Sequence, residues 1–121
     1  MSEPSRILIV DDSALARRMA REAIRKILPA AVTVEAKDGA EALEKVNGDE
    51  FDVAFIDLNM PGMNGIALAR ELSQRDHRTR LVLCTANIQE TTRQRADELG
   101  MKFIAKPISS DKVKEFLDSL D

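Results

Sequence analysis

The sequence of 121 residues contains no tryptophan or tyrosine, one cysteine and one histidine. The single cysteine excludes a disulfide framework within the chain, and Cys84 lies in an apolar run where we expect a buried, unreactive thiol. His77 has no second histidine or carboxylate at metal-ligand spacing, so we assign it no function and expect it on a loop surface. No glycine-rich phosphate loop follows the first apolar run, which argues against a nucleotide-binding fold.

Long apolar segments and a strong net charge are also absent. No apolar stretch approaches the roughly 20 residues of a membrane-spanning helix, and the N-terminal segment lacks the apolar core of a signal peptide. The net charge of -3 argues against nucleic acid or an anionic membrane as a partner. Linkers, repeats and low-complexity segments are missing as well. We therefore expect a single cytoplasmic domain spanning residues 1–121, with no nucleic-acid or membrane partner.

Apolar runs and helical patterns alternate five times along the chain, and the runs are typical of buried strands in a parallel sheet. The predicted strands are Ile7–Val10, Val32–Ala36, Asp52–Ile56, Leu81–Cys84 and Lys102–Ala105. The predicted helices are Ser13–Leu28, a short helix between Asp38 and Gly48, Ile66–Leu72, Ile88–Leu99 and Ser109–Leu120. This alternation predicts an α/β fold, a doubly wound five-stranded parallel sheet with five helices and right-handed crossovers.

Polar side chains follow four of the apolar runs, at the point where each predicted strand ends. Asp11 and Asp12 follow the first strand, Asp57 the third, Thr85 the fourth and Lys106 the fifth. Because the carboxyl ends of parallel strands share one edge of a sheet, we expect these side chains to converge. Three carboxylates repel one another unless a cation lies among them, and Mg²⁺ prefers oxygen ligands. The pattern therefore predicts a divalent-metal and phosphoryl site.

Within this pattern, Asp57 is the candidate nucleophile, because a carboxylate can accept a phosphoryl group and form an acyl phosphate. Lys106 and Thr85 can contact the phosphoryl oxygens through an ammonium and a hydroxyl group. Each residue also has an ordinary structural interpretation, since an aspartate after a strand is often only a helix N-cap. The joint occurrence of all four positions favours the functional interpretation.

These residues resemble the receiver domain family of response regulators, and the resemblance covers the whole chain. The matching residues are Asp11-Asp12, Asp38-Gly39, Glu41-Ala42-Leu43, Asp57, Met60-Pro61, Gly65, Thr85-Ala86, Phe103 and Lys106-Pro107. The resemblance implies a flavodoxin-like sheet with strand order 2-1-3-4-5. It also implies a stand-alone, chemotaxis-type response regulator, which we expect to be monomeric and to catalyse only its own phosphorylation and dephosphorylation.

The resemblance assigns the phosphoryl chemistry to particular residues. It makes Asp57 the phosphoacceptor, and it makes Asp11, Asp12, Asp57 and the backbone carbonyl of Asn59 the ligands of a Mg²⁺ cofactor. The implied phosphodonor is a histidine kinase or a histidine phosphotransfer protein. Asn59 and Asn87 flank the family's route for the attacking water, so their identities tune the lifetime of the phosphoryl group.

The resemblance also implies a switch that acts on an unidentified downstream protein. Thr85 and Lys106 sense the phosphoryl group, and Phe103, which replaces the commoner tyrosine, is the switch aromatic; the alternative is a plain core phenylalanine. The Lys106–Pro107 bond is cis in the family. The responding face comprises the fourth helix, the fifth strand and the fifth helix, because the polar segment Ile88–Leu99 carries little apolar surface to hold it down.

Two alternatives belong to other functional classes. A haloacid-dehalogenase-type phosphatase needs a second aspartate two residues after the nucleophile, but Asn59 and Ser13 stand two residues after Asp57 and Asp11. A receiver-like protein-binding platform that is never phosphorylated usually lacks one of the acids or the lysine, and this chain keeps them all. The arginine cluster of the first helix has two interpretations, a docking surface for an acidic phosphodonor or a solvated helix face; its members are Arg17, Arg18 and Arg21.

Overall fold

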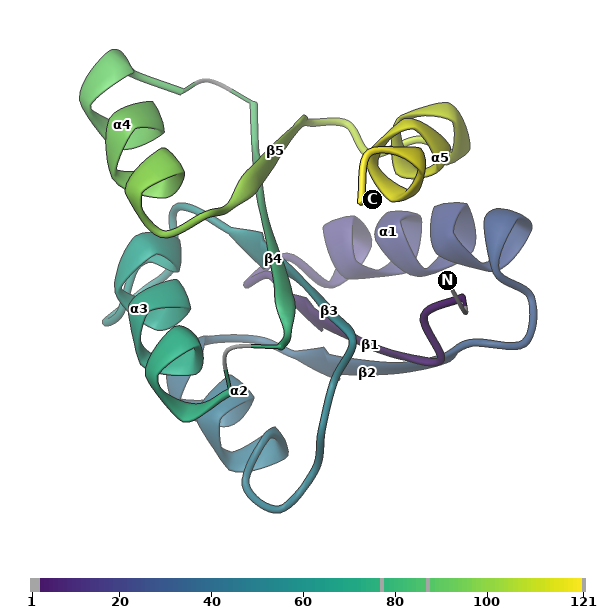
Figure 1. The fold of residues 1–121 in the computed structure, drawn as a ribbon, viewed down its shortest axis with the longest axis horizontal. Coiled ribbons are helices and arrows are strands. Elements are labelled where there is room, and N and C mark those ends of the chain that lie inside the picture. The colour runs from purple at the N-terminus through teal and green to yellow at the C-terminus, as the bar shows by residue number, and fades with distance from the viewer. Residues whose placement is uncertain (1–2, 77, 87, 121) are drawn as a thin grey trace.

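The computed structural model describes residues 3–76, 78–86 and 88–120, and it contains one parallel sheet. The strands are β1 (Arg6–Val10), β2 (Val32–Ala36), β3 (Val53–Asp57), β4 (Arg80–Thr85) and β5 (Lys102–Ala105). Their order across the sheet is β2-β1-β3-β4-β5, and every neighbouring pair is parallel (Figure 1). The predicted α/β class and the strand order implied by the resemblance are both confirmed.

Five helices connect or follow the strands: α1 (Ala14–Ile27), α2 (Gly39–Lys45), α3 (Gly65–Arg75), α4 (Glu90–Glu98) and α5 (Ser110–Asp118). Four of them begin at a residue whose side chain accepts a backbone N–H of the first turn; these N-caps are Ser13, Asp38, Asn64 and Ser109. The exception is α4, whose N-cap Gln89 makes no such bond. The prediction ended α3 too early, because the polar residues of its last turn carry no apolar signal.

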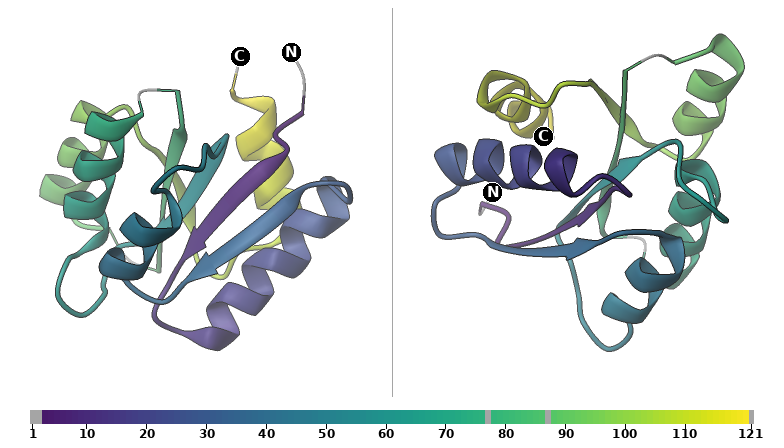
Figure 2. Two further views of the ribbon diagram at one scale, coloured as in Figure 1. Left: turned by 90° about the horizontal axis from the view of Figure 1, so that it is seen from below. Right: turned by 180° about the vertical axis from the view of Figure 1, so that it is seen from behind.

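The helices cover the sheet on both faces (Figures 1 and 2). On one face α1 and α5 share a core cluster with Ile7, Ile9 and Phe55, and on the other α2, α3 and α4 share a cluster with Leu8 and Val10. Neighbouring residues of β1 therefore serve opposite faces, as the side-chain alternation of a strand requires. Burial on both faces explains why β1 and β3 are continuous apolar runs rather than alternating ones.

Hydrogen bonds continue past the ends of the strands and carry the following residues in register. The N–H of Asp11 donates to the carbonyl of Ala36, at 3.1 Å, and the N–H of Lys106 donates to the carbonyl of Thr85, at 3.0 Å. The sheet therefore fixes the backbone of these predicted site residues, although they lie at its edge.

The structure also bears on the burial of Cys84 and on the question of membrane-spanning helices. Cys84 is buried on β4, which confirms the predicted burial, and this burial raises the pKa of its thiol to about 12. Across the described residues, every helix is too short or too polar to cross a bilayer.

Candidate functional site: three aspartates and a lysine at the carboxyl edge

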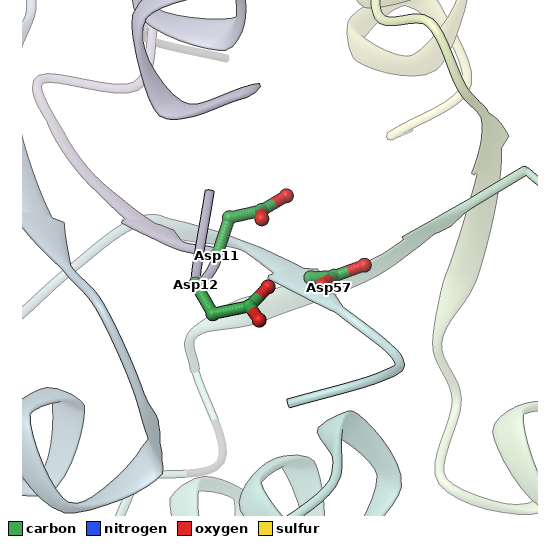
Figure 3. Close-up of side chains that lie close together, drawn as sticks. All are labelled: Asp11, Asp12 and Asp57. Atoms are coloured by element: carbon green, nitrogen blue, oxygen red, sulfur yellow. The ribbon is translucent and has the colours of Figure 1, made fainter. Parts of the chain in front are cut away.

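The carboxylates of Asp11, Asp12 and Asp57 gather at the carboxyl ends of β1 and β3 (Figure 3). One oxygen from each carboxylate lies within 4.8 Å of one oxygen from each of the other two. Asp11 and Asp57 are buried, whereas Asp12 is exposed. Adjacency of β1 and β3 in the sheet produces this convergence, as the rule for parallel sheet edges predicts.

The ammonium of Lys106 lies between two of these carboxylates. Its Nζ is 2.6 Å from Oδ2 of Asp11 and 3.0 Å from Oδ1 of Asp57. One lysine offsets one of the three formal negative charges, and the cluster still carries an acidic excess. The donor set consists of hard carboxylate oxygens at close range, which fits Mg²⁺ in both charge and ligand type.

Burial and charge shift the titration of both partners. Burial raises the pKa of Asp57 above its ordinary value, the hydrogen bond from Lys106 opposes this, and the charges of Asp11 and Asp12 add to the increase. Burial alone would lower the pKa of Lys106, but its hydrogen bonds to Asp11 and Asp57, together with the negative charges of these carboxylates, outweigh burial and raise it. The lysine therefore stays cationic at neutral pH.

The position of Asp11 is fixed by contacts to its side chain and to its backbone. Its Oδ1 accepts the N–H of Ser13 at 2.9 Å, and its carbonyl oxygen accepts a hydrogen bond from Nη1 of Arg17 at 2.7 Å. Sequence reasoning missed the second contact, because a helix position among other arginines gives no sign that one side chain folds back on a loop.

Two arginines of α1 contact β2 instead of pointing into solvent. Glu35 accepts hydrogen bonds from Nε of Arg17 at 3.1 Å and from Nη1 of Arg21 at 2.8 Å. Both interpretations of the arginine cluster therefore need correction at these two positions, because an ion pair with the sheet occupies them. Arg18 does remain exposed, beside Glu22 on the same helix.

The loop after β3 closes tightly behind Asp57. The N–H of Gly65 donates to the carbonyl of Leu58 at 2.8 Å, and a Cβ at Gly65 would overlap the backbone oxygen of Asp57. Glycine at this position therefore permits the close approach that sets the backbone of the predicted phosphoacceptor. Asn59 lies exposed in the same loop, and the role of its carbonyl as a metal ligand stays a prediction.

The remaining predicted residues lie on β4 and β5. Thr85 is buried at the end of β4, and Phe103 is half-buried on β5, with the guanidinium of Arg93 5.0 Å from its ring centroid. The role of Phe103 as the switch aromatic stays a prediction. The Lys106–Pro107 bond is cis, as the resemblance implies. Two further residues that the sequence analysis discussed lie outside the described residues; these are His77 and Asn87.

The comparison with protein families decides the identity of this arrangement. The family model for the response regulator receiver domain matches residues 7–118. The chain belongs to this family. The receiver fold, the acidic cluster and the lysine thus come together as the sequence resemblance implied.

Similar proteins support the assignment along almost the full length of this receiver. The chain is 38% identical to the chemotaxis protein CheY of Bacillus subtilis over 114 residues, covering 93% of the chain and 94% of that protein. It is 36% identical to CheY of Thermotoga maritima, covering 95% and 96%. The structure of Vibrio cholerae CheY4 gives a TM-score of 0.86 at 24% identity, covering 98% and 100%, and this likeness concerns the fold.

Proposed function

We propose that this receiver accepts a phosphoryl group on Asp57 from a histidine kinase or a histidine phosphotransfer protein. Mg²⁺ would be held by Asp11, Asp12, Asp57 and the backbone carbonyl of Asn59. The observation that carries the proposal is the convergence of three carboxylates around one lysine. Family membership supports it, because receiver domains generally bind Mg²⁺ in an acidic pocket and take phosphate from histidine kinases.

The transfer needs little covalent chemistry from the protein. An ionised carboxylate oxygen of Asp57 forms a bond to phosphorus while the bond from phosphorus to the donor's imidazole nitrogen breaks. The imidazole leaves as a neutral ring, because its other nitrogen already carries a proton. When bound, Mg²⁺ supplies positive charge to the phosphoryl oxygens, and Lys106, already 3.0 Å from Asp57, supplies a second cation.

The phosphoryl group would act as a switch through β4 and β5. It adds roughly -1.5 to -2 charges at neutral pH, which would draw the hydroxyl of Thr85 and the ammonium of Lys106 towards it. We infer that the α4-β5-α5 face carries the signal to a downstream protein. The inference is supported by the sparse anchoring of α4, in which Ala96 is the buried residue, and by the half-buried Phe103 beside it.

The required change in free energy is modest for such a switch. Reversing a 1:99 equilibrium takes about 5.5 kcal/mol of differential binding, and a smaller bias already changes a partner's affinity. The proposal includes no catalysis beyond the receiver's own phosphorylation and dephosphorylation. We expect it to act as a monomer that binds its donor and its target in turn.

Intact-mass analysis tests the phosphoacceptor directly. The wild-type protein is incubated with acetyl phosphate and Mg²⁺, beside Asp57→Asn and, as a matched aspartate control, Asp118→Asn on the exposed surface of α5. We expect a phosphoryl adduct on the wild type and on Asp118→Asn, none on Asp57→Asn, and none after Mg²⁺ is chelated. A wild type with no adduct that also fails to bind beryllofluoride would overturn the proposal and favour the unphosphorylated binding platform.

A further inference from the structure

Arg17 joins the acidic cluster to the sheet, although it is not one of the predicted metal ligands. Its side chain is 19% exposed, its Nη1 donates to the carbonyl oxygen of Asp11 at 2.7 Å, and its Nε donates to Glu35 at 3.1 Å. Two donors of one rigid guanidinium thus bind a loop carbonyl and a strand carboxylate at the same time. The geometry fixes the carbonyl relative to β2.

Glu35 is itself held firmly, so it can serve as an anchor. It pairs with Ile9 in the register of β1 and β2, and its second carboxylate oxygen accepts a hydrogen bond from Arg21 at 2.8 Å. Because both oxygens are engaged, the carboxylate cannot rotate freely and presents one oxygen to Arg17. Charge-assisted hydrogen bonds of this kind are shorter and stronger than neutral ones.

The carbonyl that Arg17 binds belongs to the peptide between Asp11 and Asp12. The carboxylate of Asp11 has its own supports in Ser13 and Lys106. The carboxylate of Asp12 is exposed, and within the described residues it forms neither a hydrogen bond nor an ion pair. The preceding peptide therefore sets the backbone from which the Asp12 side chain projects into the cluster (Figure 3).

We propose that Arg17 is a positioning residue for Mg²⁺, which holds the Asp11–Asp12 peptide so that the Asp12 carboxylate faces Asp11 and Asp57. The inference rests on the proposed Mg²⁺ site. The charge of Arg17 acts against Mg²⁺ binding, because a guanidinium beside the cluster repels a divalent cation. Positioning predicts that loss of Arg17 weakens Mg²⁺ binding, whereas charge alone predicts that it strengthens binding. The sign of the change therefore distinguishes the two effects.

The experiment is a Mg²⁺ titration followed by the amide NMR spectra of the metal-free protein. The variants are Arg17→Met, which removes charge and donors, and Arg17→Lys, which keeps the charge but replaces the two separate donor nitrogens of the guanidinium fork with a single nitrogen. The matched control is Arg21→Met, because Arg21 binds the same glutamate but not Asp11. We expect Mg²⁺ to bind about tenfold more weakly to both Arg17 variants, as for other residues that orient metal ligands. The loss in Arg21→Met should be clearly smaller, because Arg17 keeps its own contacts to Asp11 and Glu35 in that variant.

The outcomes separate this inference from the proposed function. A wild type that shows no saturable Mg²⁺ shifts in the cluster would overturn the Mg²⁺ site itself. If the wild type binds and Arg17→Met binds as tightly or more tightly, the positioning role is wrong. An equal loss in Arg21→Met would also overturn it, because the effect would then come from Glu35 and not from the carbonyl contact. Should Arg17→Met fail to fold, Arg17→Lys decides the question.

Discussion

Helices α1 and α4 both follow a strand whose end carries predicted site residues, yet they are anchored very differently. α1 has 14 residues, a side-chain N-cap at Ser13, and buried Ala20, Ala23 and Ile24. α4 has 9 residues, an N-cap without a side-chain bond, and one buried residue, Ala96. The helix beside the predicted metal-binding acids is therefore held tightly, and the helix on the proposed output face is held loosely.

This difference matches what the two helices are proposed to do. A cluster of like charges stays together only when the surrounding backbone is fixed, and α1 supplies that through its packing and through Arg17. A switch needs an element whose alternative positions differ little in free energy, and sparse burial provides it. The comparison leads to four predictions on stability and local opening.

The largest expected effect is on the packing of α1. Ile24 has no exposed surface, so Ile24→Ala should lower the free energy of unfolding by about 3 kcal/mol through lost burial and a residual cavity. The matched change beside α4 is Leu99→Ala, at a half-buried residue, where we expect about 1 kcal/mol. Urea unfolding followed by far-ultraviolet circular dichroism measures both, since the chain has no tryptophan or tyrosine. Equal losses at the two positions would refute the difference in anchoring.

The second prediction removes the N-cap side chain of α1 and introduces one at α4. Ser13→Ala removes the hydrogen bond from the N–H of Ala16 to Oγ of Ser13 and should destabilise the protein by about 1 kcal/mol. Gln89→Ser introduces a capping side chain at α4 and should slow amide hydrogen exchange in residues 90–98. If Gln89→Ser folds normally and hydrogen exchange in α4 is unchanged, capping does not limit the opening of this helix.

Sequence patterns predicted the parts of this receiver that depend on periodicity and on the sheet edge. Apolar runs, helical stripes, caps and the length of the polar segment before Gly100 together predicted the strands and helices of the described residues. The edge rule placed Asp11, Asp12 and Asp57 together because parallel strands end on the same side. The same rule placed Lys106 beside them. These features need only the local chain and the direction of each strand.

The contacts of long side chains could not be predicted in the same way. Arg17 and Arg93 each occupy a helix surface position that is equally compatible with solvent, and only the assembled fold brings Asp11 and Phe103 within their reach. The close approach of Gly65 to Asp57 likewise depends on how a loop closes in three dimensions. Such contacts depend on rotamers and on the packing of segments distant in sequence.

The third prediction concerns the opposite end of β1, which a carboxylate secures. Oδ2 of Asp52 accepts the N–H groups of Ser5, at 2.7 Å, and of Arg6, at 3.0 Å, and these bonds hold the pKa of Asp52 below its usual value. A lowered pKa in the folded state means that the stabilisation is complete above the unfolded value of 3.8 and is lost as the pH falls through the folded value.

The variant Asp52→Asn keeps an acceptor but removes the charge. At pH 7 the wild type should be more stable by up to about 1 kcal/mol, a modest value because Asp52 is exposed. The stability difference between the two proteins should narrow as the pH falls below the unfolded value of 3.8. Urea unfolding of both proteins between pH 7 and pH 3 measures it, and a gap that widens towards acid would contradict the assigned role.

The smallest expected effect is at a side-chain contact between α4 and Phe103, the predicted switch aromatic. The guanidinium of Arg93 lies 5.0 Å from the ring centroid of Phe103, and such a cation–π contact at an exposed site contributes about 0.5 kcal/mol. Arg93→Ala should therefore change global stability little but increase hydrogen exchange in α4, because it removes one of few contacts there. A double-mutant cycle with Phe103→Leu isolates the pair. A coupling energy near zero would mean that β5 does not restrain α4 through this ring. A measurable coupling energy would make Arg93→Ala the variant with which to test whether α4 carries a signal from Asp57.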